Sequence, residues 1–213
     1  MKKTSNKKNK IPEPTILRLS AYRRALQDYK EQSAAKFVSS RQLGELANRN
    51  ASIVRKDLSY FGEYGMPSKG YEIDHLLDQI VNIMNVKQQH AVALVGVGNL
   101  GKALLGYPGF KKQGFSIEVA FDNNAIKIGK KIQEIKVRNL KDLPLEVAKR
   151  EIKISFITVP AVAAQEVANL LVEAGMRAII NFTPARIWVP PKVILRHVDL
   201  TRELEVVSYY LGK

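Results

Sequence analysis

Three closely spaced glycines lie between an apolar segment and an expected helix. Gly96, Gly98 and Gly101 form a G-x-G-x-x-G motif between an apolar strand and a helix expected from about Leu100. The first glycine permits a tight turn, the second lets backbone approach a pyrophosphate, and the third lets the helix pack on the strand. Amide groups at the start of the helix favour an anion. The motif predicts a dinucleotide site, with a glycine-rich turn that binds nothing as the alternative.

A second expected strand, SIEVAFD, ends in an acidic residue, Asp122. A carboxylate there can accept hydrogen bonds from the adenosine ribose and would repel a 2′-phosphate, which predicts NAD(H) over NADP(H). TVPA and NFTPA end two later strands and suit a nicotinamide and its ribose, although ordinary turn chemistry also explains them. The predicted cofactor-binding residues are Gly96, Val97, Gly98, Asn99, Leu100, Gly101, Asp122, Thr158, Val159, Pro160 and Asn181.

Groups for catalysis or metal binding are scarce in the sequence. It has no cysteine, and its three histidines, His75, His90 and His197, are far apart, which predicts no disulfide, no thiolate chemistry and no metal site. A nicotinamide dehydrogenase needs an acid or base and a place for its substrate. Only residues 199–213 follow the last expected strand. We therefore expect no catalytic residue and no enzyme, with a small NAD-dependent oxidoreductase as an alternative.

A second set of polar residues lies in ASIVRKDLSYFG, residues 51–62. Wound as a helix, this segment puts apolar residues on one face and a polar, basic set on another. Such a face can contact DNA phosphates and base edges, although a solvated face on an ordinary helical domain is the alternative. The predicted DNA-binding residues are Ser52, Arg55, Lys56 and Ser59, joined by Lys69 from a hairpin described next.

The surrounding elements would make this face part of a winged helix-turn-helix. The segment VSSRQLGELANRN predicts a helix capped by Ser39 with Gln42, with Leu43, Leu46 and Ala47 facing inward and a polar turn after it. Two short helices joined by a tight turn are typical of the helix-turn-helix. EYGMPSKGYEI then predicts a hairpin around Lys69, as in the wing of this motif. A longer helix is expected before it, with Leu19, Tyr22, Leu26 and Tyr29 in one stripe.

The net charge supports a polyanionic partner and is unevenly distributed. The 213-residue chain carries +14, and residues 1–62 hold 8 Lys and 6 Arg against 5 acidic residues, a balance of +9. Nucleic acid is the first candidate partner for such a surface, although a solvated basic surface has the same composition. No apolar run is long enough to span a membrane, and none follows the basic start as in a signal peptide. We expect a cytoplasmic protein without a membrane partner.

Alternating strands and helices after residue 87 predict a Rossmann-type doubly wound parallel sheet, so the fold class is α/β. The C-terminal DLTRELEVVSYYLGK is an amphipathic helix capped by Asp199. Its apolar stripe either packs on its own sheet or inserts into a second subunit. A protein that binds a palindromic DNA site needs such a two-fold symmetric dimer. The expected domains are a disordered basic tail (1–10), a winged helix-turn-helix (11–86), a Rossmann domain (87–198) and a dimerisation helix (199–213).

In these stretches the chain resembles the Rex family of bacterial redox-sensing transcriptional repressors. The resemblance rests on SSRQLGELANRNASIVRKDLSYFGEYG, GVGNLGKALLGYPGF, TVPA and NFTPA, and covers nearly everything after the tail. It implies a homodimer with a swapped C-terminal helix, a winged helix-turn-helix bound to a double-stranded DNA operator, and a Rossmann domain that binds NAD(H). NADH would release the protein from its operator, whereas NAD⁺ would permit binding. A DNA-binding regulator that senses a coenzyme A thioester is an alternative, which Asp122 disfavours.

The resemblance also implies a switch formed by Arg24, Tyr107 and Asp199. Asp199 would pair with Arg24 in the DNA-binding form and with Tyr107 when NADH is bound. Family members often carry an aromatic residue directly after this aspartate, and the chain has Leu200 instead. This departure implies a looser nicotinamide pocket.

Overall fold

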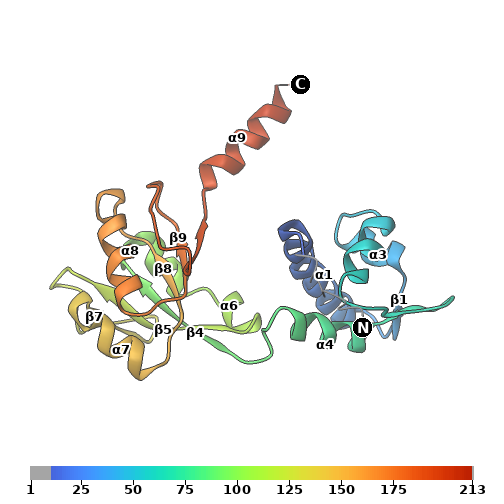
Figure 1. Ribbon diagram of the computed structural model, residues 1–213, viewed down its shortest axis with the longest axis horizontal. Helices are drawn as coiled ribbons and strands as arrows, with labels where there is room; N and C mark the ends of the chain where they lie inside the picture. The colour runs from blue at the N-terminus through green and yellow to red at the C-terminus, as the bar shows by residue number, and fades with distance from the viewer. Residues whose placement is uncertain (1–10, 213) are drawn as a thin grey trace, which may run out of the picture. The chain divides into compact units, whose positions relative to one another are not determined.

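The computed structural model describes residues 11–212, so the predicted basic tail lies outside the described residues. The chain divides into two compact units that meet at residues 87 and 88, drawn in blue to green and in green to red in Figure 1. Within the described part, none of the helices is long and apolar enough to cross a membrane.

The first unit is a small helical domain with a three-stranded antiparallel sheet in the order β1-β3-β2. The hairpin β2–β3 follows the helix pair α2–α3, which confirms the predicted winged helix-turn-helix. The short strand β1 was not predicted, because two residues carry no periodic pattern. The elements are α1 (Glu13–Gln32), β1 (Phe37–Val38), α2 (Ser40–Leu46), α3 (Ala51–Ser59), β2 (Gly65–Met66), β3 (Gly70–Glu72) and α4 (Ile73–Ile83).

The helix pair α2–α3 is held by local chemistry that the sequence indicated. The capping box is present, since the Gln42 amide donates to Ser39 Oγ (3.1 Å) and the Ser39 amide donates to Gln42 Oε1 (2.9 Å). The expected inward position of Leu46 is wrong, because its side chain is 45% exposed. Gly44 is buried instead, and a Cβ there would collide with the carbonyl oxygen of Arg49. The turn therefore closes too tightly against α2 for a side chain.

A buried carboxylate fastens α3 to α1. Asp57 lies on the inner face of α3 and is 1% exposed. It accepts two hydrogen bonds from the Arg18 guanidinium (2.6 and 2.7 Å), one from the Tyr22 hydroxyl (2.8 Å) and one from the Thr15 hydroxyl (3.1 Å). Burial alone would raise the pKa of Asp57, but these hydrogen bonds outweigh it and the pKa is lowered. The orientation of α3 on α1 is thus specified by a charged network.

The second unit is a doubly wound α/β domain. Its sheet order is β10-β9-β8-β4-β5-β7-β6, and all neighbouring pairs are parallel except β6 with β7. The six parallel strands follow the 3-2-1-4-5-6 order of dinucleotide-binding sheets. The strands are β4 (His90–Val95), β5 (Phe115–Asp122), β6 (Lys131–Ile132), β7 (Ile135–Asn139), β8 (Ile154–Ile157), β9 (Ala178–Asn181) and β10 (Ile194–His197).

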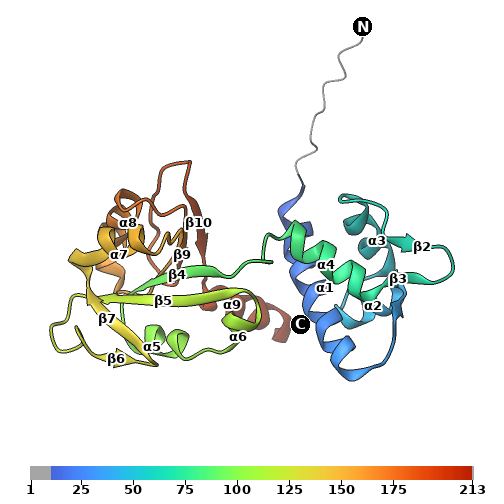
Figure 2. The same cartoon turned by 90° about the horizontal axis from the view of Figure 1, so that it is seen from below.

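Helices cover both faces of this sheet, as Figure 2 shows. One face carries α5 (Asn99–Leu105) and α6 (Gly109–Lys112), and the other carries α7 (Leu143–Lys149) and α8 (Ala164–Glu173). Short 3₁₀ turns at Leu140–Asp142 and Ala161–Ala163 precede α7 and α8. The strand order reverses between β4 and β8, and ligands of such sheets bind beyond the carboxyl ends of the strands at this position.

The last helix, α9 (Leu200–Leu211), leaves its apolar stripe uncovered. Asp199 caps it by accepting the amides of Thr201 (3.0 Å) and Arg202 (3.3 Å). Every residue from 199 to 212 is exposed, and Figure 1 shows α9 extending away from the sheet. Within this chain the stripe therefore does not pack on its own sheet.

The Asp57 network predicts a pH-dependent contribution to stability. Asp57→Ala should lower the free energy of unfolding by about 3 kcal/mol at neutral pH, because Arg18 and Tyr22 lose their buried acceptor. The folded pKa lies below the unfolded one, so this contribution is complete above the ordinary value of about 4 and fades as pH falls through the folded value. Urea unfolding followed by circular dichroism measures it.

The matched control is Asp74→Ala, which breaks the exposed pair of Asp74 with Lys30. It should change the unfolding free energy by less than about 1 kcal/mol. A loss in Asp57→Ala no larger than in this control, or equal at pH 7 and pH 3, would contradict the role given to Asp57.

Candidate functional site

The glycine loop between β4 and α5 has the geometry that a dinucleotide requires. Gly96 has a φ of +100°, a conformation that favours glycine, and a Cβ at Gly101 would collide with the carbonyl oxygen of Gly96. The helix therefore starts directly against the end of the strand. A Cβ at Gly98, by contrast, would meet no atom within 4 Å. The open side of the loop is thus available for the close approach of a ligand.

The end of β8 is tied to this loop by one hydroxyl. Thr158 Oγ1 lies 2.6 Å from the carbonyl oxygen of Gly96 and 3.1 Å from that of Val95, and donates to this pair. The two strand ends thereby form one rigid edge of a cavity of about 270 Å³. The predicted residues that line this cavity are Gly96, Gly98, Asp122, Thr158, Val159 and Pro160.

Asp122 closes the other side of the cavity and is 7% exposed. Its Oδ2 accepts the Val97 amide (2.9 Å) and the Lys127 ammonium (2.9 Å), and its Oδ1 accepts the Asn124 amide (2.8 Å). Burial would raise the pKa of Asp122, but the Lys127 bond and the two amides outweigh it, so the pKa is lowered. The carboxylate is therefore charged at the place expected for an adenosine ribose.

The remaining predicted cofactor residues do not line this cavity. Val97 is buried and contributes its amide to Asp122, Gly101 is buried beneath the loop, and Asn99 and Leu100 are exposed at the start of α5. Asn181 is fully buried. Its Oδ1 accepts the Thr183 amide (3.0 Å) and its Nδ2 donates to the Ala185 carbonyl (2.8 Å). Asn181 shapes the NFTPA loop, and its contact with a nicotinamide stays a prediction.

Sequence reasoning missed several residues of the cavity wall. Lys127 is the one with charge, and its only signal in the sequence is its position five residues after Asp122. The apolar members carry no polar side chain that would indicate a ligand contact in the sequence. These missed residues are Val95, Asn123, Asn124, Lys127, Leu140, Ala163 and Val167. Residues 11–212 contain no cluster of three or more His, Asp or Glu side chains that could hold a metal ion.

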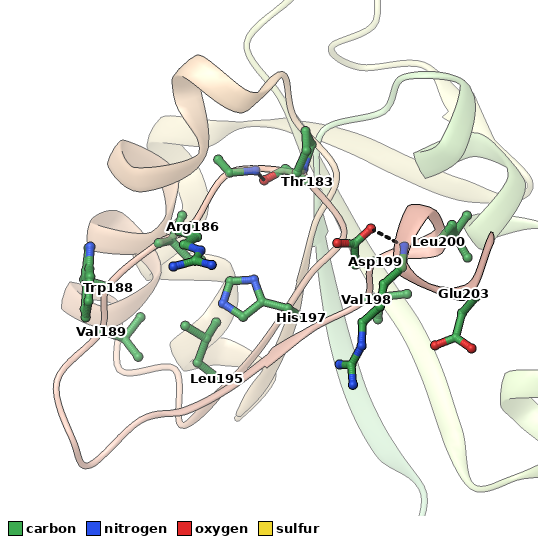
Figure 3. A pocket seen from close by; sticks show the side chains of 14 residues that line it. Thr183, Arg186, Trp188, Val189, Leu195, His197, Val198, Asp199, Leu200 and Glu203 are labelled. Atoms are coloured by element: carbon green, nitrogen blue, oxygen red, sulfur yellow. Dashed lines mark hydrogen bonds between the residues drawn. The ribbon is translucent and has the colours of Figure 1, made fainter. Parts of the chain in front are cut away.

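A larger cavity of about 770 Å³ lies between the loop after β9, strand β10 and the first turn of α9. Figure 3 shows His197 and Arg186 on one side of it and Asp199 on the other, with the Asp199 carboxylate turned toward the backbone of its own helix. This cavity brings the NFTPA loop and the cap of α9 together, which sequence spacing did not indicate.

The three predicted switch residues each have a local neighbour in this single chain. The Arg24 guanidinium donates to Ser20 Oγ (3.1 Å) on α1. Tyr107 is 57% exposed and meets the ring of Phe110 edge-on at 5.0 Å. Asp199 caps α9. The exchange of partners between them stays a prediction.

The predicted DNA-binding residues share one exposed surface of the first unit. Ser52, Arg55, Lys56 and Ser59 are all exposed on α3, whereas Val54 and Leu58 on its other face are buried. Asp57, the acidic residue of α3, is buried against Arg18, so the exposed face is purely polar and cationic.

Neighbouring side chains orient two of these cations. The Arg55 guanidinium donates to Ser40 Oγ (2.8 Å) at the first turn of α2. Lys69, in the β2–β3 turn, holds its ammonium 5.8 Å from the centre of the Phe37 ring, a cation–π contact. Helix and wing therefore present ordered positive charge, as phosphate contacts require.

The glycine geometry predicts different effects for two similar substitutions. Gly98→Ala should fold normally, because its Cβ enters open space. It should lower the affinity for NADH about tenfold or more, or about 1.4 kcal/mol, because the methyl group fills the side of the loop that a pyrophosphate approaches. Gly101→Ala should lower the melting temperature instead, because its Cβ meets Gly96. Calorimetric titration and thermal unfolding measure both. Unchanged NADH affinity in Gly98→Ala would place the ligand elsewhere.

Comparison with known proteins supports both halves of this arrangement. Two family models match, "Putative DNA-binding protein N-terminus" over residues 10–59 and "CoA binding domain" over residues 87–185. The chain is 44% identical to the redox-sensing transcriptional repressor Rex of Carboxydothermus hydrogenoformans, over 96% of this chain and 98% of that one. It is also 44% identical to the Rex protein of Desulfitobacterium hafniense, over 95% and 96%.

Solved structures agree with these relatives. The chain superposes on RSP in complex with β-NAD⁺ and operator DNA with a TM-score of 0.90 and 34% identity, covering 96% of this chain and 94% of that one. RSP in complex with β-NADH matches with a TM-score of 0.85, covering 95% and 94%, and RSP is described as a Rex-family repressor. With these sequences and structures matched along nearly its whole length, the chain belongs to the Rex family of redox-sensing transcriptional repressors.

Proposed function

We propose that this protein binds operator DNA through its first unit and senses the NADH/NAD⁺ ratio through the cleft of its second unit. It would occupy the operator with NAD⁺ or without ligand, leave it with NADH, and act in the cytoplasm. The observation that carries the proposal is the presence, in one chain, of the cationic face of α3 and the glycine-loop cleft closed by Asp122. The relative RSP, solved with NAD⁺ and operator DNA and also with NADH, supports it.

On the DNA side, α3 would lie in the major groove. Arg55 and Lys56, with Ser52 and Ser59 beside them, would contact base edges and phosphates, and Lys69 on the wing would contact backbone or minor groove. The Asp57 network keeps α3 fixed on α1 and removes the one acidic charge from its exposed face. Both effects favour a polyanionic partner.

The exposed stripe of α9 suggests a second copy of the chain as a further partner. Leu204 and Leu211 are 69% and 82% exposed, and the helix has a well-formed cap but no buried residue. A folded protein rarely leaves such a face in water, and a reader of a palindromic operator needs two-fold symmetry. The stripe would pack on the partner subunit in a homodimer.

In the cleft, NAD(H) would place its pyrophosphate beside Gly98 and its adenosine ribose beside Asp122. The cofactor can supply hydride chemistry when bound, but the protein would use it as a signal. Among the described residues that line the cleft, Asp122 and Lys127 are the titratable ones, and each is bonded to the other. Both groups are engaged in this ion pair. We propose that the protein binds the nucleotide as a signal, without catalysing a reaction on it and without a metal.

A ligand changes DNA affinity only by binding two conformations differently. We place this difference in the partners of Asp199, as the family resemblance implies. With Arg24 as the partner, the first units of the two subunits would be held at the spacing of the operator half-sites. With Tyr107 as the partner, favoured by NADH, they would be released.

The placement of α3 predicts the effect of Arg55→Ala. On an operator selected by this protein from a random duplex pool, the variant should lose about 1–3 kcal/mol of binding free energy and relax its sequence preference. Lys30→Ala is the matched control, because it removes one exposed cation from α1 and should leave the preference unchanged. Fluorescence anisotropy measures both. An Arg55→Ala protein with wild-type affinity and preference would show that α3 does not contact the bases.

The switch predicts that Asp199→Ala still binds NADH and DNA but loses most of the NADH-driven release. Loss of a helix cap alone costs about 1 kcal/mol, so Asp199→Ser, which keeps a capping oxygen, separates the carboxylate from the cap. Both variants should show nearly equal operator affinities with and without NADH. A wild-type ratio of these affinities in either variant would refute the role of Asp199.

A further inference from the structure

A lysine that sequence reasoning did not select lies inside the proposed ribose site. Lys127 places its ammonium 2.9 Å from Asp122 Oδ2, and its side chain is 29% exposed. A tight turn brings it there, since Asn124 Oδ1 accepts the Ile126 amide (2.9 Å) and the Asn124 carbonyl accepts the Lys127 amide (3.0 Å). Lys127 is the one basic side chain among the described residues that line the cleft.

This pairing changes what Asp122 can do for a ligand. A carboxylate offers about four acceptor positions, and three are occupied by Val97, Asn124 and Lys127. A ribose diol therefore finds one free position unless Lys127 moves away. The negative charge that would repel a phosphate on the ribose is also largely compensated by the ammonium at hydrogen-bond distance.

We propose that Lys127 is a specificity-determining residue of the dinucleotide site, a cation that Asp122 keeps away from a phosphate on the adenosine ribose. With Asp122 present, the ammonium is bonded to the carboxylate and the site takes an unphosphorylated ribose. Without the carboxylate, the same ammonium is free to bind a phosphate. This inference rests on the proposed NAD(H) function and extends it to the choice between NAD(H) and phosphorylated relatives.

Two ligands carry a phosphate on the adenosine ribose, NADP(H) at the 2′ position and coenzyme A at the 3′ position. Fragments of the cofactor separate them from each other and from the nicotinamide. 5′-AMP, 2′,5′-ADP and 3′,5′-ADP share the adenosine and differ only in the phosphate on the ribose. The affinity of either bisphosphate divided by that of 5′-AMP reports on this subsite alone.

The experiment titrates the full chain calorimetrically with these three fragments, NADH and NADPH. In Asp122→Asn, the affinity ratio of 2′,5′-ADP or 3′,5′-ADP to 5′-AMP should rise at least about tenfold over the wild type, the size of one charge-assisted hydrogen bond. Adding Lys127→Gln to this variant should abolish the gain. The bisphosphate that gains more identifies the position that Lys127 reaches.

Two further variants keep the test decisive if Asp122→Asn does not fold. Lys127→Gln alone leaves the Asp122 charge uncompensated, so the preference for NADH over NADPH should rise at least several-fold. Lys130→Gln removes an exposed charge from the same segment outside the cleft and should leave that preference unchanged.

If Lys127 has a purely structural role, its substitution will lower the affinity for all ligands alike and leave every affinity ratio unchanged. That result would overturn the inference, whereas NADH binding by the wild type would still support the proposed function. A wild-type protein that binds none of the adenine nucleotides would overturn both.

Discussion

The proposed dinucleotide cleft depends on the carboxylate of Asp122. This buried group joins the glycine loop through the Val97 amide, the turn after β5 through the Asn124 amide, and Lys127 through an ion pair. These contacts hold the carboxyl ends of β4 and β5 together with the glycine loop that follows β4. On the opposite side, Thr158 ties β8 to the same loop. A cleft held from both sides in this way is preorganised, so little binding energy is lost in ordering it.

The first unit is built on a comparable contact. Asp57 is a second buried carboxylate, and it is held by a guanidinium, a phenol and a hydroxyl from α1. In both units one acidic residue is buried and holds an element of a proposed binding site, the glycine loop in one unit and α3 in the other. Forming a buried pair of this kind costs desolvation, whereas removing one partner leaves a buried charge without compensation. A fixed orientation of α3 would suit the DNA contact that we propose for its exposed cationic face.

Much of the fold followed from local sequence patterns, because each was complete within one segment. The strand-glycine-helix motif, the Ser39 capping box and the Asp199 cap all have partners within a few residues. The ion pairs that were missed depend on the path of the chain. Arg18 and Asp57 are far apart in the sequence, and Lys127 reaches Asp122 because a turn follows β5. Leu46 was misplaced because helical periodicity does not reveal that Gly44 makes the close contact. Local patterns also did not show that Asn181 is buried, because its side-chain amide contacts the Ala185 carbonyl in the following loop and His197 at the end of β10.

In the proposed function, the NADH/NAD⁺ ratio controls operator occupancy because the nucleotide site and the DNA site are coupled. Fluorescence anisotropy at fixed ionic strength measures the affinity of the wild-type protein for a selected operator, first with saturating NAD⁺ and then with saturating NADH. We predict an affinity about 5–150-fold weaker with NADH than with NAD⁺. Because linkage is reciprocal, the affinity for NADH relative to that for NAD⁺ should fall by the same factor when the operator is bound. Equal operator affinities with saturating NAD⁺ and with saturating NADH would show that the nucleotide does not control DNA binding.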